Sequence, residues 1–76
     1  SGRRAMKLTA AQQAARMAIL RDVVRSGGRD RWPHLHSHGH HFKQVLACAN
    51  RGDLEPLGAY EWIITEAGRK ALEEQP

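Results

Sequence analysis

The stretch Gly52-Asp-Leu-Glu-Pro-Leu-Gly-Ala-Tyr-Glu-Trp-Ile-Ile-Thr-Glu-Ala-Gly-Arg-Lys-Ala-Leu72 predicts a tight β-hairpin that runs directly into a helix. Glu55-Pro-Leu-Gly58 favours a type I turn, with Pro at the second position and Gly in the left-handed site of a three-residue loop. This register pairs Leu54 with Tyr60. Because side chains alternate along a strand, four apolar residues then face one core: Leu54, Tyr60, Trp62 and Ile64.

Helices are predicted on both sides of this hairpin. Thr65 is the expected N-cap of a helix from Glu66 to about Glu74. Near the start of the chain, Thr9 and Gln12 have the spacing of a capping box, so a first helix runs from there to about Arg25. Its apolar positions recur at helical spacing and comprise Ala11, Ala14, Ala15, Met17, Ala18, Leu20, Val23 and Val24. The residues left on its outer side are Gln13, Arg16, Arg21 and Asp22.

A further helix is predicted from about Ser37, as N-cap, to Asn50. Its apolar positions are Phe42, Val45, Leu46 and Ala49, with Cys48 as a small packing residue beside them. The opposite face carries His40, Lys43, Gln44, Ala47 and Arg51. Before this helix, Pro33 biases Trp32 away from helical geometry. We therefore expect only a short third strand near residues 30–33 or a single turn around residues 31–35.

Composition and charge limit the class of protein. A chain of 76 residues makes one domain, and its net charge of +4 is unevenly spread. Residues 1–51 carry ten Lys or Arg against two Asp, whereas residues 52–76 carry two against six acids. A basic first part fits a polyanionic partner. With one Cys and no apolar run long enough to span a membrane, we expect a cytoplasmic protein, with residues 1–5 as an expression-tag remnant.

The second half of the chain, roughly residues 37–74, resembles the winged helix-turn-helix domains of bacterial and phage regulators. In that family a basic residue and Gly end the recognition helix, and the returning wing strand leads into a Thr-x-x-Gly-Arg-x-x-Leu helix. Arg51-Gly52 and the stretch from Thr65 to Leu72 match that pattern. The resemblance implies a small α+β, winged-helix-like domain with three main helices, a two-stranded antiparallel hairpin and an abbreviated or absent middle helix.

The resemblance also implies binding to double-stranded DNA in transcription regulation, with the helix at about residues 38–50 as recognition helix. The residues that it assigns to DNA are Arg29, Arg31, His38, His40, Lys43, Gln44 and Arg51. Family wings usually carry a cation at the tip, whereas residues 55–59 carry none, so the wing is not expected to touch the minor groove. A protein-binding adaptor, or phage-type inhibitor that docks through this acidic hairpin, is the alternative. A homodimer would fit DNA binding, because one small domain reads few bases.

Five histidines lie within eight residues, and they raise the question of a metal site. In an extended segment His34, His36 and His38 would share one face, as the imidazole ligands of zinc, nickel or copper do. No thiolate lies nearby, so the favoured interpretation is a polar loop that titrates near neutral pH, with no cofactor. No nucleophile, base and orienting group can be named together, and the chain is therefore not expected to be an enzyme.

Overall fold

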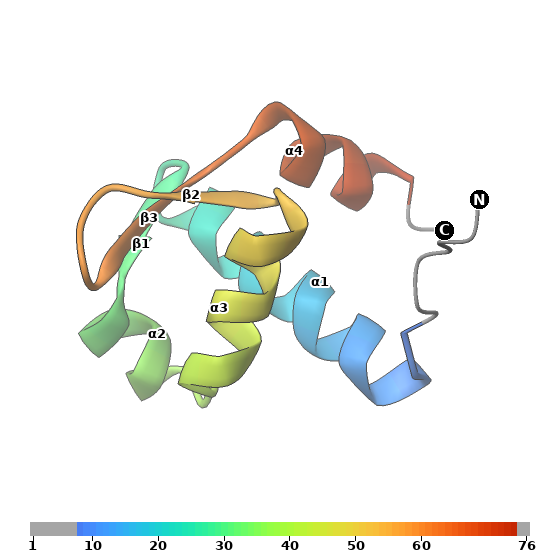
Figure 1. The fold of residues 1–76 in the computed structure, drawn as a ribbon, viewed down its shortest axis with the longest axis horizontal. Helices are drawn as coiled ribbons and strands as arrows, with labels where there is room; N and C mark the ends of the chain where they lie inside the picture. Colours follow the sequence, from blue (N-terminus) through green and yellow to red (C-terminus); the bar gives the residue numbers. More distant parts are fainter. Residues whose placement is uncertain (1–7, 75–76) are drawn as a thin grey trace.

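The chain alternates helices with short strands. The computed structural model describes residues 8–74. Its elements are α1 (Ala10–Arg25), β1 (Arg29–Arg31), α2 (Trp32–Ser37), α3 (Phe42–Arg51), β2 (Leu54–Pro56), β3 (Glu61–Ile64) and α4 (Glu66–Glu73) (Figure 1). The strands form one antiparallel sheet in the order β1-β3-β2. The predicted α+β, winged-helix-like fold is confirmed, and the suggested third strand is β1. Residues 1–5, interpreted as a tag remnant, lie outside the described part.

The predicted helix starts at Thr9 and Thr65 are confirmed. The Thr9 hydroxyl accepts the Gln12 N–H at 3.0 Å, and the Gln12 side chain accepts the Thr9 N–H at 2.9 Å. Thr65 in turn accepts the Gly68 N–H at 3.0 Å. Each bond satisfies a backbone donor that the first helical turn leaves without a partner. None of the described helices is both long and apolar enough to cross a membrane.

The start of the recognition-helix candidate was predicted wrongly. Ser37 is the last residue of α2, and α3 begins only at Phe42, with His41 as its N-cap. Pro33 does not prevent α2, because it lies in the first helical turn, where a backbone N–H is not needed. Gly39 has a φ of 87° in the turn between the two helices. The middle helix is thus abbreviated to six residues but present.

The hairpin register differs from the prediction. Leu54 pairs with Ile64 and not with Tyr60, and Pro56 pairs with Trp62. The centre of the turn is therefore shifted from Leu57 to Ala59, and the Leu57 N–H donates to the Glu61 carbonyl at 2.8 Å. Because the shift is an even number of residues, the side chains keep their faces. Three of the four expected apolar residues are buried, but Tyr60 is left outside the core at 59% exposure.

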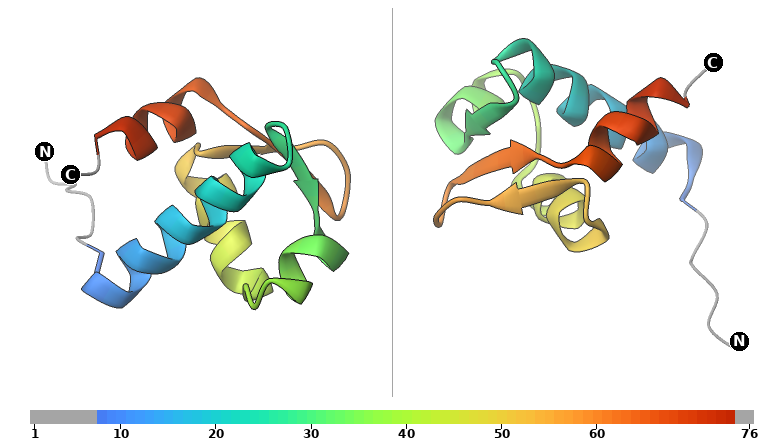
Figure 2. Two further views of the ribbon diagram at one scale, coloured as in Figure 1. Left: turned by 180° about the vertical axis from the view of Figure 1, so that it is seen from behind. Right: turned by 90° about the horizontal axis from the view of Figure 1, so that it is seen from above.

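The sheet has a buried face and an outer face. Asp30 pairs with Trp62 on the inner face, whereas Arg29 pairs with Ile63 and Arg31 with Glu61 on the outer face. Glu55 also pairs with Ile63, so it lies on the outer face too. Seen from above, β1 lies beside the end of α1 and β2 lies beside α3 (Figure 2, right). Strand β3 lies between β1 and β2, so β1 is at the edge of the sheet away from α3.

The core lies between α1, α3 and the inner face of the sheet. Its fully or almost fully buried apolar residues are Met17, Ile19, Leu20, Val23, Leu35, Val45, Cys48, Leu54, Trp62 and Ile64. Ile19 was missing from the predicted apolar face of α1, and Leu46, expected inside, is 39% exposed. Arg16 and Asp22 were expected to face outward. Both are instead partly buried in ion pairs, because their partners come from distant parts of the chain.

Candidate nucleic-acid interface

The exposed face of α3 is short, basic and polar. Val45 and Cys48 are its buried residues, so the helical period points Lys43, Ala47 and Asn50 away from the core. Gln44 and Arg51 flank this line on one side and Leu46 on the other. The sequence of α3 contains no acidic residue. This surface can donate hydrogen bonds to an anionic ligand without an acidic side chain of α3 opposing it.

The two cations of α3 have different surroundings. Lys43 is exposed and forms no ion pair with any of residues 8–74. Arg51 places Nη1 3.8 Å from Asp53 Oδ2 and 3.9 Å from Cys48 Sγ. The Arg51 side chain is 28% exposed and is partly neutralised by Asp53, which Arg16 binds more closely. Lys43, Gln44 and Arg51 thus lie together on α3, as predicted.

The Arg16–Asp53 ion pair fixes the end of α3 against α1. Arg16 Nε lies 2.7 Å from Asp53 Oδ2 and Nη2 lies 3.0 Å from Oδ1, which is a two-pronged contact. The hydrogen bond to Asp53 raises the pKa of Arg16 further above its ordinary value. Asp53 directly follows Gly52, whose φ of 96° ends the helix. The contact therefore sets where α3 ends.

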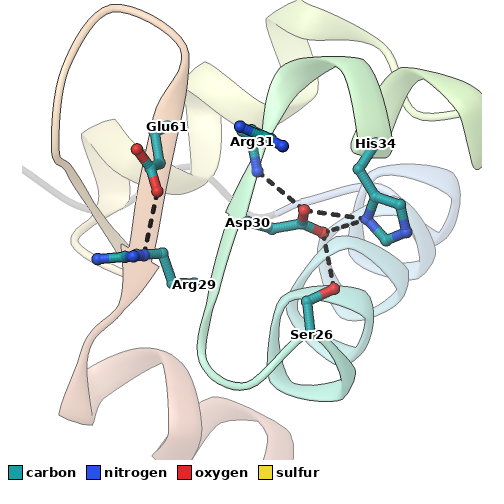
Figure 3. Close-up of a pocket in the computed structure, with 6 residues that line it drawn as sticks. All are labelled: Ser26, Arg29, Asp30, Arg31, His34 and Glu61. Atoms are coloured by element: carbon teal, nitrogen blue, oxygen red, sulfur yellow. Dashed lines mark hydrogen bonds and ion pairs between the residues drawn. The ribbon is translucent and has the colours of Figure 1, made fainter.

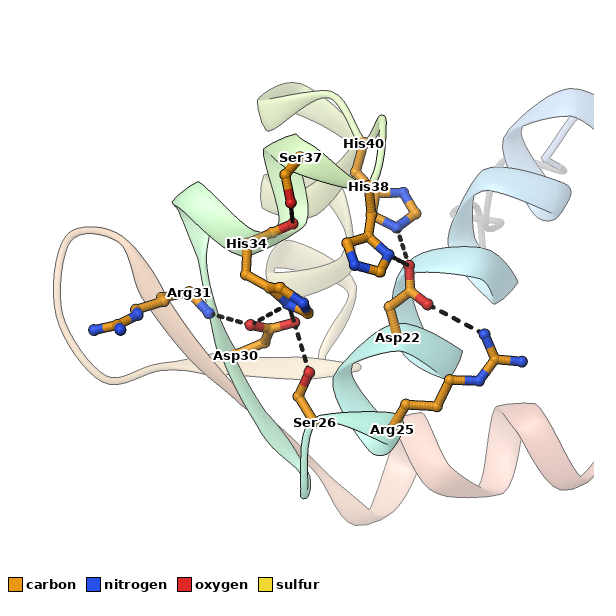
Figure 4. Close-up of polar contacts among 9 residues, drawn as sticks. All are labelled: Asp22, Arg25, Ser26, Asp30, Arg31, His34, Ser37, His38 and His40. Atoms are coloured by element: carbon orange, nitrogen blue, oxygen red, sulfur yellow. Dashed lines mark hydrogen bonds and ion pairs between the residues drawn. The ribbon is translucent and has the colours of Figure 1, made fainter.

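His38 and His40 were predicted to contact DNA from the recognition helix, but they lie in the turn before it. His40 Nε2 is 2.6 Å from Asp22 Oδ2 on α1, and the His40 side chain is only 10% exposed (Figure 4). His38 Nδ1 lies 3.5 Å from the same carboxylate oxygen. Both side chains face α1 and not the exposed side of α3. Both contact Asp22 of α1, and their predicted position on the recognition helix is wrong.

The histidines do not form the suggested metal site. Residues 32–37 are helical, so positions two apart point to different sides, contrary to the extended segment that was assumed. The rings of His34 and His38 lie 4.4 Å apart, whereas His36 packs against Trp32 at 5.2 Å. Within residues 8–74 no group of three or more His, Cys, Asp or Glu side chains is arranged to hold a metal ion.

Arg29 and Arg31, the other predicted DNA contacts, lie on β1. They line a polar pocket of about 490 Å³ together with Ser26, Asp30, His34 and Glu61 (Figure 3). Arg29 Nε is 3.0 Å from Glu61 Oε2, so this cation is partly neutralised. Asp30 accepts from the Ser26 hydroxyl and the Arg31 N–H, and His34 Nδ1 lies 2.8 Å from it. Because β1 and β2 are opposite edges of the sheet, this pocket is not continuous with the α3 surface.

No family model, curated protein or solved structure matches the chain. The winged-helix-like description accordingly rests on the order of the elements and the strand order. It does not establish membership of a DNA-binding family.

Two exposed residues beside α3 were missed in the sequence. Asn50 lies seven residues after Lys43 and therefore belongs to the same helical face. Tyr60 packs on Phe42 at the start of α3, with ring centroids 5.9 Å apart. The helical period was enough to find Asn50. Tyr60 could not have been found, because its exposure depends on the hairpin register.

Cys48 belongs to the core and not to a reactive site. Its side chain is 1% exposed. Burial raises the pKa of the Cys48 thiol to about 11, although the Arg51 guanidinium opposes the shift. The thiolate, which is the reactive form, is therefore scarce at neutral pH.

Proposed function

We propose that this domain binds double-stranded DNA, as transcription regulators do, by placing α3 in the major groove. One observation carries the proposal: the exposed face of α3 presents Lys43 without an acidic partner among the described residues, in a helix that contains no acid. Helices with such faces donate to phosphate oxygens and base edges. The ten residues of α3 span roughly 15 Å, enough to cross the major groove, which is about 12 Å wide.

The side chains of α3 divide into two roles under this proposal. Lys43 and Arg51 contact phosphates or guanine edges, and Gln44 and Asn50 have the amide groups that pair with adenine. Ala47 lies between these residues, and its small side chain leaves room for the floor of the groove. Arg29 and Arg31 lie on β1, at the edge of the sheet away from α3, and are left out of this interface.

The acids of the hairpin do not oppose this docking. Glu55 and Glu61 lie on the outer face of the sheet, and Glu61 is paired with Arg29 at 3.0 Å. α3 packs beside β2 on the other side. The negative charge that the sequence assigned to the wing is therefore turned away from the helix.

A titration of the full chain against a random duplex at two salt concentrations tests the proposal. Binding should weaken with salt by a slope of about 0.9 per phosphate contact, and Lys43→Glu should weaken binding about ten-fold or more on every sequence. Lys70→Glu is the matched control, because Lys70 is equally a surface lysine but lies on α4. It should bind nearly as the parent does. Equal affinities for parent and Lys43→Glu would contradict the proposal.

The alternative function is a protein-binding adaptor, and one observation favours it. The outer face of the sheet exposes Ile63 at 37%, and Leu57, in register with Glu61, adds a second exposed apolar side chain at 46%. Exposed apolar residues at a sheet face are typical of protein contacts, although single ones are common. An adaptor would lose its partner on Leu57→Ala and keep it on Lys43→Glu, which is the opposite of the pattern expected for DNA.

Sedimentation of the free protein would show whether it forms the expected homodimer.

A further inference from the structure

Tyr60 is the most exposed large side chain of the hairpin, yet it is held in place. Its ring packs against Phe42 with centroids 5.9 Å apart. Its carbonyl oxygen accepts the Trp32 N–H at 2.8 Å, which ties the loop to the first residue of α2. Phe42 is itself supported by Trp32 at 5.0 Å and by Trp62 at 6.0 Å. An exposed aromatic ring on such a base loses little conformational freedom when it binds a partner.

The surroundings of Tyr60 point to an anionic, partly apolar partner. Tyr60 packs against Phe42, the first residue of α3, and Lys43, which forms no ion pair with any of residues 8–74, is the next residue of that helix. Glu61 and Glu55 point to the outer face of the sheet. The hairpin thus presents an exposed ring at the first turn of α3, with its acids on the outer face of the sheet.

We infer that Tyr60 is the DNA contact of the hairpin, and that its ring packs on the deoxyribose-phosphate backbone beside the groove that α3 enters. It takes the place of the cation that a wing usually carries, and it uses apolar contact in place of charge. The expectation from sequence concerned only the minor groove, and a contact of the hairpin with the backbone is compatible with it. The inference rests on the proposed function, because it needs α3 at the DNA.

The contact is tested in the full chain with a fluorescein-labelled random duplex, by anisotropy at two salt concentrations. Tyr60→Ala should weaken binding about 3- to 10-fold without changing the salt slope, because no ionic contact is lost. Tyr60→Phe should bind as the parent does, since the ring is kept. Leu57→Ala is the matched control: Leu57 belongs to the same loop but lies on the outer face, and its loss should have no effect.

A fourth variant does not depend on removing the ring. Tyr60→Lys restores a wing cation, and if the position lies at the backbone it should raise the salt slope by about one. Thermal unfolding by circular dichroism checks that each variant is folded.

Four results would overturn the inference. They are parent-like affinity of Tyr60→Ala, loss of binding in Tyr60→Phe as large as in Tyr60→Ala, a greater loss in Leu57→Ala than in Tyr60→Ala, or an unchanged slope in Tyr60→Lys. In each of these cases salt-dependent binding of the parent and its loss in Lys43→Glu would leave the proposed function standing. A parent that binds no DNA at either salt concentration would overturn both.

Discussion

Replacing Gly68 by Ala should destabilise the fold although it improves helix propensity. Gly68 lies in the first turn of α4, where the helix passes directly over the chain that leaves α3. A Cβ atom there would lie 2.9 Å from Ile64 Cγ1, 3.1 Å from the Asp53 carbonyl carbon and closer still to the Asp53 carbonyl oxygen. Real Cβ atoms do not approach a backbone carbonyl so closely. The two segments must therefore move apart to admit a methyl group.

The size of the effect follows from what that movement disturbs. The Asp53 carbonyl accepts the Thr65 N–H at 3.0 Å and the Thr65 hydroxyl at 3.0 Å. Weakening these bonds costs about 0.5–1.5 kcal/mol each, and overpacking costs about 1–3 kcal/mol. Ala regains about 1 kcal/mol of helix propensity over Gly. The net loss in the free energy of unfolding is about 1–5 kcal/mol, a large part of the stability of so small a domain.

Urea unfolding followed by circular dichroism measures this loss. Gly58→Ala is the matched control, because nothing lies within 4 Å of the Cβ that it would add and no positive φ is required. It should be neutral or stabilising by up to about 1 kcal/mol. If Gly68→Ala were as stable as the parent, or more stable, the close approach of α4 to Asp53 would be wrong. Destabilisation by Gly58→Ala of similar size would show that loss of glycine, and not the contact, is the cause.

Two further predictions concern buried polar groups. Arg16→Met keeps most of the packing but leaves the buried Asp53 carboxylate without its two-pronged partner, so the free energy of unfolding should fall by about 2–4 kcal/mol, and Arg16→Met/Asp53→Asn should recover part of it in urea titrations. Because burial raises the pKa of Cys48 to about 11, the native thiol should react with a disulfide reagent at pH 8 far more slowly than the unfolded thiol. An unfolded thiol ionises from about pH 9, so the stability due to Cys48 holds below pH 9 and is lost between pH 9 and 11. Cys48→Ala should flatten the pH dependence of unfolding in that window.

The features that could be predicted from the sequence are those with local causes. Thr9 with Gln12, and Thr65 before Gly68, act over three residues, so their spacing alone identifies two helix starts. The boundary between α2 and α3 has no such signal, because the histidine-rich stretch lacks an apolar period and Pro33 suits either a strand or a first helical turn.

The hairpin register was missed for a tertiary reason. A turn over Pro56 to Gly58 satisfies local turn preferences, but the observed turn, two residues further along, lets the Tyr60 carbonyl accept the Trp32 N–H and the Tyr60 ring pack against Phe42. Both partners come from other elements, so no turn rule could favour this register. The faces of the strands were nevertheless right, since the register error is even.

The residues of the candidate site also separate into those that a local pattern predicts and those that depend on tertiary structure. Lys43, Gln44 and Arg51 follow from the helical period within one element. Arg29 and Arg31 were assigned to the same surface, but they lie on β1, at the opposite edge of the sheet from β2. Local patterns could not show this, because the strand order depends on pairing across 30 residues and more. His40 was misplaced because its partner, Asp22, lies eighteen residues earlier on another helix.

Ion pairs at both ends of α3 help to fix its orientation in the domain. α3 buries Val45 and Cys48 fully and packs Phe42 and Ala49 partly against the core. Its start is fixed by His40 on Asp22, and its end by Arg16 on Asp53. Thr65 adds a bond to the Gly52 carbonyl at 2.6 Å. Because polar contacts at both ends help to set its orientation, substitutions on its exposed face should cost the fold little.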